Sequence, residues 1–262
     1  MSFADSKGIK LYYEVHGEGR PIVFVHGGGG NTLSWFQQVP HFAKQYRVIT
    51  VDLRGFKNSK CPVEDVHPKY FPDDMRAILD AEGIDKAAFV CQSLGAWAGL
   101  PLAARHPDRV ASLVLTGSPT PAYSEQNWKV LQESGERFMN RAGRGVATGL
   151  LAPHFIEQNP GMKFLYDQIR LLNQPFNARR MQDDDVKLHP QDFIGYGVPT
   201  LMMGGALDFF LTPDSHRHVA TLIPGAELYD FPQSAHSAYF EEPEHFNRVV
   251  SEFLARCYPA FA

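Results

Sequence analysis

The residues most able to do chemistry lie in one stretch, AAFVCQSLGAWAG, at positions 87–99. An apolar run over residues 87–90 breaks at CQSLG and resumes as an apolar helical pattern, which predicts a strand, a sharp turn and a helix. Ser93 lies at the tip of that turn, so its hydroxyl is exposed and the amide of Leu94 begins a helix. Such a serine can also be a simple helix N-cap. As a nucleophile it would need a histidine to take its proton and a carboxylate to orient that histidine.

A second stretch, His26 followed by four glycines, comes directly after another apolar run. Its amides could face an anion, because a helical pattern follows over residues 32–42. Three interpretations compete: a nucleotide phosphate loop, an oxyanion loop and a flexible turn. A Walker loop requires Gly-Lys followed by Ser or Thr, and a GxGxxG fingerprint meets Thr32 or Leu33 where its last glycine belongs. The sequence therefore excludes both kinds of phosphate loop.

The composition favours small-molecule chemistry. The chain has 262 residues, of which 44% are hydrophobic, and this is enough for one core domain with an insertion. Its net charge is −4 and its 25 lysines and arginines are scattered, so it offers no basic field for nucleic acid or an anionic membrane. We expect a small-molecule substrate as the partner, with neither nucleic acid nor a membrane.

Compartment and redox state are also indicated by the sequence. The first residues, MSFADSKGIK, lack the apolar core of a signal peptide, and no run approaches the roughly 18 apolar residues of a membrane span. The cysteines, Cys61, Cys91 and Cys257, lack CxxC spacing, which indicates reduced thiols rather than disulfides or a thiolate metal site. We therefore expect a cytoplasmic protein.

Strands and helices alternate along the chain. Strands are predicted over residues 9–16, 22–25, 47–51, 87–90, 110–116, 198–204 and 227–231. The first two strands are expected to form a hairpin. Helices are predicted over residues 72–81, after the turn at Ser93, from residue 213 and over residues 243–257. This alternation is typical of an α/β fold with a doubly wound, mostly parallel sheet.

Three motifs resemble those of the α/β-hydrolase family. CQSLG resembles its nucleophile elbow, as a CxSxG variant in which Cys91 replaces the first glycine. The HG pair after the second strand resembles the family's HGx oxyanion loop. Residues 52–59, DLRGFKNS, resemble its DxRGxGxS turn, with Phe56 and Lys57 in place of the usual residues. The resemblance covers most of the chain outside residues 119–190 and implies the α/β-hydrolase fold.

The resemblance also implies the oxyanion hole and the rest of a triad. The amides of Gly28 and Leu94 would hold an oxyanion, with Gly29 as the alternative because four glycines leave the register open. In this family the order is serine, acid, histidine. Asp208, in GGALD, resembles the family's acid turn and is favoured over Asp214, which is interpreted as a first-turn helix residue.

His236 is the expected base, because it lies in a turn after the last strand and the residues through Pro243 resemble the family's histidine loop. Three other late histidines lie in predicted helices and are interpreted as solvated: His216, His218 and His245.

Residues 119–190 contain no convincing buried strand and several helical stretches, which predicts a helical lid inserted into a core of residues 1–118 and 191–262. Some apolar side chains of the lid and of the acid and base loops should line a pocket. The candidate substrate-binding residues are Gly29, Trp128, Phe138, Phe209, Phe210 and Tyr239.

No metal or other cofactor is expected, because His216 and His218 point to different faces of a helix and HExxH is absent from the sequence. We predict a serine hydrolase that cleaves a carboxylic ester or lactone of a small, largely apolar substrate through an acyl-enzyme. One alternative is a carbon-carbon bond hydrolase of a ring-cleavage product, since arginines in the lid could hold a dienoate acid. Another is a non-catalytic small-molecule receptor.

Overall fold

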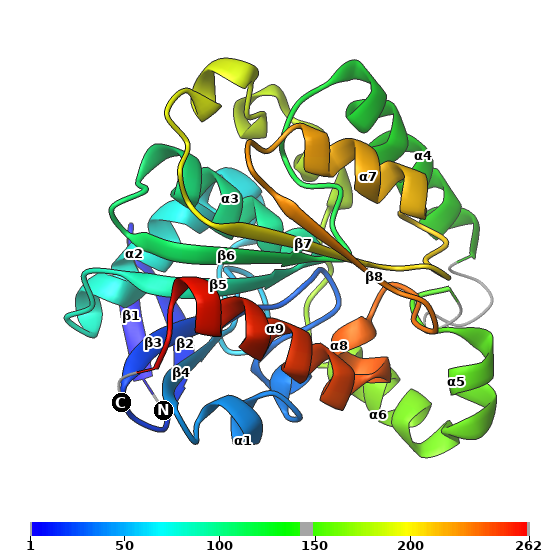
Figure 1. Ribbon diagram of the computed structural model, residues 1–262, viewed down its shortest axis with the longest axis horizontal. Helices are drawn as coiled ribbons and strands as arrows, with labels where there is room; N and C mark the ends of the chain where they lie inside the picture. Colours follow the sequence, from blue (N-terminus) through cyan, green and yellow to red (C-terminus); the bar gives the residue numbers. More distant parts are fainter. Residues whose placement is uncertain (1, 142–148, 261–262) are drawn as a thin grey trace.

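A computed structural model describes residues 2–141 and 149–260 of the chain. Eight strands form one sheet in the order β1-β2-β4-β3-β5-β6-β7-β8 (Figure 1). Their bounds are β1 Ser2–Ser6, β2 Ile9–His16, β3 Arg20–Val25, β4 Tyr46–Val51, β5 Ala87–Gln92, β6 Val110–Thr116, β7 Thr200–Gly205 and β8 Glu227–Phe231. β1 and β2 pair antiparallel, as do β2 and β4, and the other neighbours are parallel. The mostly parallel sheet is as predicted.

The central strands are apolar because helices cover both faces of the sheet. β5 is buried at every position. Val23 and Val25 of β3 belong to the core on one face, and Ile22 and Phe24, which alternate with them, belong to the core on the other. A run of apolar residues without polar alternation therefore marks a strand between two layers.

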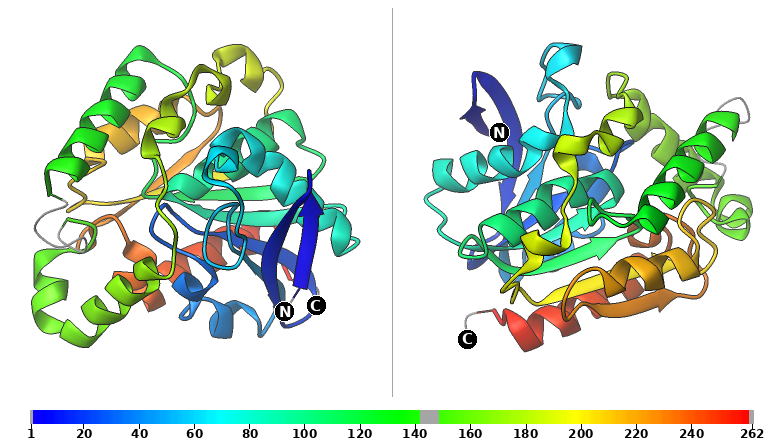
Figure 2. Two further views of the ribbon diagram at one scale, coloured as in Figure 1. Left: turned by 180° about the vertical axis from the view of Figure 1, so that it is seen from behind. Right: turned by 90° about the horizontal axis from the view of Figure 1, so that it is seen from above.

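Helices form those two layers. The helices are α1 Val39–Phe42, α2 Phe71–Ala81, α3 Ala96–Arg105, α4 Glu125–Arg141, α5 Pro153–Gln158, α6 Pro160–Leu171, α7 Pro213–Thr221, α8 Ala238–Glu241 and α9 Pro243–Cys257. In the right-hand view of Figure 2, α9 lies on one side of the sheet and α2 and α3 lie on the other. The doubly wound fold that the sequence predicted is thus confirmed.

Between β6 and β7 the chain leaves the sheet. This segment contains α4, α5 and α6 and the 3-10 helices Ala178–Gln182, Asp184–Val186 and Pro190–Phe193. A parallel bridge between Ala122 and Leu188 joins its two ends. α4, α5 and α6 lie toward one end of the sheet in Figure 1, and α4 contacts α7.

Two local predictions were wrong. Residues 9–16 do not pair with residues 22–25, because β2 pairs with β1 and β4, whereas β3 lies between β4 and β5. Residues 32–42 form no single helix but a 3-10 turn, Thr32–Trp35, followed by the short α1. Pro40 accounts for the break, since proline lacks an N–H and is tolerated only in the first turn of a helix.

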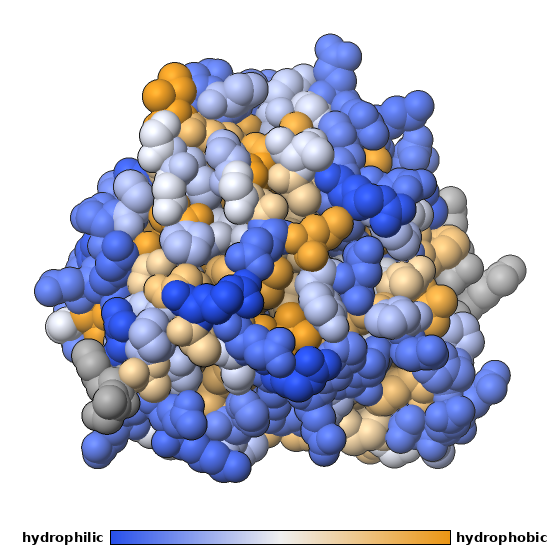
Figure 3. Space-filling view, in the orientation of Figure 1, coloured by the Kyte–Doolittle hydropathy of each residue, from blue (hydrophilic) through white to orange (hydrophobic). Residues whose placement is uncertain are grey.

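The face of the molecule in Figure 3 is largely hydrophilic, with separate apolar patches, as is common for globular proteins. Within the described residues, no helix has both the length and the apolar character needed to cross a membrane.

Candidate active site

The turn after β5 places Ser93 in a strained conformation. Its φ is +48°, a value that non-glycine residues rarely adopt. The chain enters the 3-10 turn Ser93–Gly95 and then α3, so strand, turn and helix follow one another as predicted. Gly95 permits the close crossing, because a Cβ there would lie 2.5 Å from the carbonyl oxygen of Val25. The elbow therefore lifts the Ser93 side chain toward the carboxyl edge of the sheet.

Ser93, His236 and Asp208 form one hydrogen-bonded chain. The Nε2 of His236 lies 3.1 Å from the Oγ of Ser93, and its Nδ1 lies 2.8 Å from Oδ2 of Asp208. An ionised Asp208 only accepts, so Nδ1–H donates to it and Nε2 is left to accept the Ser93 proton. His236 is 8% exposed, whereas Ser93 is half-buried. The arrangement can abstract the hydroxyl proton of Ser93.

Asp208 is held in its ionised form despite its position. Burial by itself would raise the pKa of this carboxyl, but the charge of His236 and its hydrogen bond outweigh burial, and the pKa is lowered. Its Oδ1 also accepts the amides of Phe210, at 2.7 Å, and Leu211, at 3.1 Å. These two bonds fix the orientation of the carboxylate.

Glycines make room for the loop that carries His236. At Gly117, just after β6, a Cβ would lie 2.6 Å from the carbonyl oxygen of His236, and the φ is +55°. At Gly205, at the end of β7, a Cβ would collide with the carbonyl oxygens of Ser234 and Ala235. The loop therefore lies directly on the ends of two strands.

The glycine run after β3 lies beside the elbow. The Nδ1 of His26 lies 2.7 Å from the carbonyl oxygen of Gly27, and Leu53 donates its amide to Nε2 at 2.9 Å. Burial lowers the pKa of His26 to about 4, so it is neutral, with its proton on Nδ1. Asp52 accepts the amide of Thr32 at 2.7 Å. The DLRGFKNS turn thus braces the glycine loop.

Two amides are placed to receive an oxyanion. The backbone nitrogens of Gly28 and Leu94 donate to no partner within residues 2–141 and 149–260. A Cβ at Gly28 would lie 3.9 Å from Cδ2 of Leu94, so the two residues are neighbours. At Gly29 a Cβ would collide with the guanidinium of Arg170, which lies over the loop.

The predicted substrate contacts fall into two groups. Phe210 lies against His236, with ring centroids 5.7 Å apart, and Phe209 is 36% exposed beside it. Tyr239 is buried against Trp35, and Trp128 is buried against Tyr123. Both predicted side chains therefore contact other rings in the protein interior. The side chain of Phe138 is outside the described residues.

The solvated interpretation of His216 was wrong. This residue is fully buried, its ring lies over Gly204 of β7, and burial lowers its pKa to about 4. Neither ring nitrogen has a hydrogen-bond partner among the described residues. The sequence of α7 did not reveal this burial, because a histidine can lie on either the buried or the exposed face of an amphipathic helix. Asp214 lies in the first turn of α7, as expected, and it is exposed and paired with Arg217.

Three residues near the site were not predicted from the sequence. Ser118, just after β6, donates to the carbonyl oxygen of Ser93 at 2.8 Å. Asn173 donates to the carbonyl oxygen of Gly29 at 3.1 Å, and Glu241 accepts amides of the His236 loop. The position of Ser118 at a strand end and of Glu241 five residues after His236 were the available signals.

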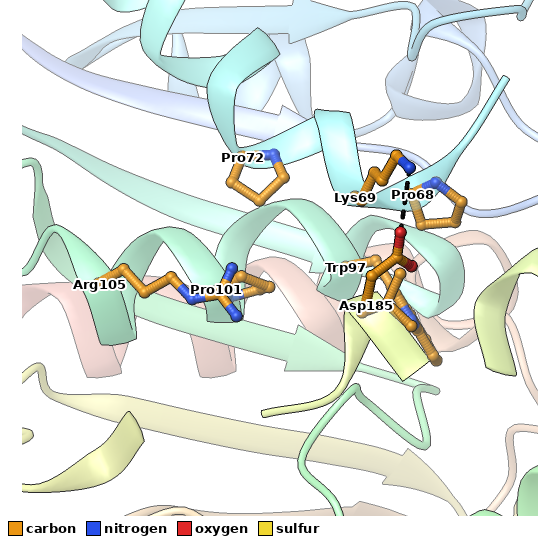
Figure 4. Close-up of a pocket in the computed structure, with 8 residues that line it drawn as sticks. Pro68, Lys69, Pro72, Trp97, Pro101, Arg105 and Asp185 are labelled. Carbon is orange, nitrogen blue, oxygen red and sulfur yellow. Dashed lines mark hydrogen bonds and ion pairs between the residues drawn. The ribbon is translucent and has the colours of Figure 1, made fainter. Parts of the chain in front are cut away.

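A small pocket lies away from Ser93, at α3 (Figure 4). Its lining residues are Pro68, Lys69, Pro72, Trp97, Pro101, Arg105, Asp185 and Val186. Beside it, His67 faces Asp183 at 3.1 Å and accepts the Lys69 amide on Nδ1, while Lys69 pairs with Asp185. The Nδ1 of His67 is thus occupied by a backbone amide, and the two aspartates contact His67 and Lys69.

Comparisons with known proteins agree with the fold. Residues 20–148 match the family model of the alpha/beta hydrolase fold. An AB hydrolase superfamily protein of Bacillus subtilis is 26% identical over 94% of this chain and 95% of its own length. A 2-hydroxy-6-oxononadienedioate/2-hydroxy-6-oxononatrienedioate hydrolase of Burkholderia vietnamiensis is 27% identical, covering 96% and 93%. The structure of an N-acyl homoserine lactone degrading enzyme is 27% identical, with a TM-score of 0.82 and coverage of 96% and 100%.

Proposed function

Since this chain is a hydrolase of the α/β-hydrolase superfamily, we propose that it cleaves a carboxylic ester or lactone of a small, largely apolar substrate. The observation that carries the proposal is the hydrogen-bonded chain of Ser93, His236 and Asp208 at the carboxyl edge of the sheet. The lactone-degrading enzyme among the similar structures supports the same chemistry.

In the proposed reaction, Ser93 Oγ attacks the carbonyl carbon while His236 Nε2 takes the hydroxyl proton. Asp208 stabilises the resulting imidazolium. The amides of Gly28 and Leu94 donate to the oxyanion, and loss of one such donor typically lowers turnover about 100- to 1000-fold. His236 then returns the proton to the leaving alkoxide, and water releases the acyl group from Ser93 by the same route.

We propose further that residues 119–190 form a cap over the site, with residues 1–118 and 191–262 as the core. Hydrogen bonds from this segment reach the Asp208 loop, the His236 loop and the glycine loop: Ser134 to the Phe210 carbonyl, Tyr166 to Ser237 and Asn173 to Gly29. Phe209 and Phe210 are the best-placed pocket residues, because one is exposed and the other contacts His236.

Cleavage of a carbon-carbon bond in a ring-cleavage product is the second candidate. It is favoured by the dienedioate hydrolases among the relatives, at 27% identity. The same Ser93 would serve either reaction, so substrate comparison must separate them.

The test is hydrolysis of p-nitrophenyl acetate and hexanoate, an N-acyl homoserine lactone and a 2-hydroxy-6-oxodienoate by the protein and by Ser93→Ala. We expect ester and lactone turnover to fall by about 10⁴-fold or more in Ser93→Ala. Ser251→Ala is the matched control. Ser251 lies on α9 and is not a site residue, so this variant should retain full activity.

Equal ester hydrolysis by wild type and Ser93→Ala would reject Ser93 as the nucleophile. Ser93-dependent cleavage of the dienoate alone would establish the second candidate instead. Saturable binding of these compounds without turnover would indicate a receptor.

A further inference from the structure

Glu241 is a buried carboxylate that the proposed reaction does not use. It ends α8, five residues after His236, and is 8% exposed. Its Oε1 accepts the amide of Ala235 at 3.0 Å and the amide of Ser237 at 3.3 Å. These are the two neighbours of His236, so a single oxygen fixes the backbone on both sides of that histidine.

The second oxygen of Glu241 reaches a different part of the chain. Oε2 accepts the amide of Ala152 at 2.7 Å, in the segment between β6 and β7. One carboxylate therefore joins the loop of the expected base to the segment that we propose to be the cap. Tyr166 of α6 makes a second link to the same loop, through the hydroxyl of Ser237 at 2.9 Å.

We propose that ionised Glu241 is a positioning residue that fixes His236 for catalysis and latches the chain at Ala152 onto the His236 loop. The proposal rests on the proposed function, because it assigns His236 the role of base.

The latch requires both oxygens as acceptors. The three amides are donors only, so a protonated carboxyl would present its O–H to one of them and lose that bond. A glutamine at this position would likewise present its NH₂ group to an amide N–H. Loss of a bond on either side leaves the loop or the segment without one of its anchors.

The surroundings place this protonation near neutral pH. Burial raises the pKa of Glu241 to about 7, against the three amide hydrogen bonds that lower it. The charged or titratable groups that face it from other elements are Asp208, whose charge raises its pKa further, and Tyr166 of α6. Glu241 is therefore ionised above about pH 7, where the latch holds, and protonated below it.

The test compares Glu241→Gln with wild type on p-nitrophenyl acetate from pH 5.5 to 8.5. We expect kcat/KM of the variant to be about tenfold lower at pH 8, mainly through kcat, because misplacement of a catalytic group by about 1 Å can cost 10²-fold. The ratio of wild type to variant should fall to about one at pH 5.5, with its midpoint near pH 7. Glu252→Gln, exposed on α9, is the control and should give a ratio of one at every pH.

A second measurement uses wild type alone and needs no substrate. The amide proton resonances of Ala152, Ala235 and Ser237 should shift together with one midpoint near pH 7. This measurement tests the latch even if Glu241→Gln does not fold.

A ratio that is constant with pH would overturn the positioning role, even if the three amides titrate. Amides that do not titrate together between pH 5.5 and 8.5 would overturn the latch. If Ser93→Ala keeps wild-type activity, the proposed function fails instead, and the amide titration still decides whether the carboxylate joins the two segments.

Discussion

At the scale of single residues, the elbow depends on which small side chains lie around Ser93. Cys91 stands where the family pattern has glycine, and it is fully buried between β5 and α3. A Cβ added at Gly99 of α3 would lie 2.5 Å from the Sγ of Cys91. The side chain of Cys91 in β5 therefore occupies the space that the absence of a side chain at Gly99 leaves in α3. Cys91 and Gly99 together keep α3 close to the sheet.

This pairing predicts compensation between two substitutions. Gly99→Ala should lower the free energy of unfolding by about 1–3 kcal/mol, because it overpacks the helix against Cys91. Cys91→Gly should cost about 1 kcal/mol through the cavity and the flexible backbone. The double variant should lose less stability than the summed losses of the two single variants. Some loss should remain, because the Cβ at residue 99 also approaches Leu113.

Urea unfolding of the four proteins measures the coupling, and p-nitrophenyl ester hydrolysis measures activity. We expect Cys91→Gly to keep kcat within about threefold, since burial raises the pKa of the thiol and leaves it unreactive. A larger loss of kcat with unchanged folding would show that the thiol has a chemical role. Additive stabilities would show that the two side chains do not share one space.

The reactive residue types could be predicted from the sequence because their chemistry is specific. Ser93, Asp208 and His236 were expected to meet, and they lie within hydrogen-bonding distance. Supporting residues such as Glu241 and Ser118 were missed, because their positions in the chain do not show which amide or carbonyl each side chain meets. The burial of His216 was missed for the same reason, since only the tertiary fold brings Gly204 against it.

At the scale of elements, α6 is tied to the glycine loop by two asparagines. Asn31 donates to the carbonyl oxygen of Ile169 at 2.9 Å and to Asn173 at 3.3 Å. Asn173 in turn donates to the carbonyl oxygen of Gly29 at 3.1 Å. The end of α6 therefore limits the movement of the loop whose amides are proposed to bind the oxyanion.

Asn173→Ala should weaken this restraint. We expect kcat for ester hydrolysis to fall about three- to tenfold with KM nearly unchanged, because a loosened donor loop affects the transition state more than substrate binding. Gln168→Ala, exposed on α6, is the control and should behave as wild type. A rise in KM with constant kcat would instead mean that Asn173 acts on substrate binding.

Element boundaries show where local sequence patterns are insufficient. The strands of the buried sheet were predicted because both faces are apolar, but the partners of β2 were not. Pairing depends on which strands lie side by side in space, and β1, with the sequence SFADS, is too short and polar to be recognised alone. The proposed cap has no strand period, so its helices could be predicted but their contacts with the site could not.

At the scale of the whole molecule, three buried groups make stability depend on pH in opposite directions. His26 and His216 have their pKa values lowered to about 4 by burial, so between pH 6.5 and 4 the unfolded chain binds their protons and the native protein does not. Their contributions to stability are therefore lost as the pH falls through this window. Glu241 has its pKa raised to about 7, so between pH 7 and 4.5 the native protein binds its proton and the unfolded chain does not. Its effect on stability therefore improves as the pH falls.

Two variants separate these contributions. His216→Leu removes a ring whose nitrogens lack partners among the described residues, so it should be neutral or slightly stabilising at pH 7. Relative to wild type, its advantage should grow by about 1.4 kcal/mol per pH unit as the pH falls from 6.5 toward 4. Glu241→Gln should change in the opposite sense: its free energy of unfolding relative to wild type should decrease as the pH falls from 7 to 4.5. Urea unfolding at pH 7, 6 and 5 measures both differences, and curves parallel to wild type would contradict the assigned protonation states.

Because Glu241→Gln is expected to lose activity above pH 7, where the buried charge also lowers stability, the same carboxylate would support catalysis at a cost to folding.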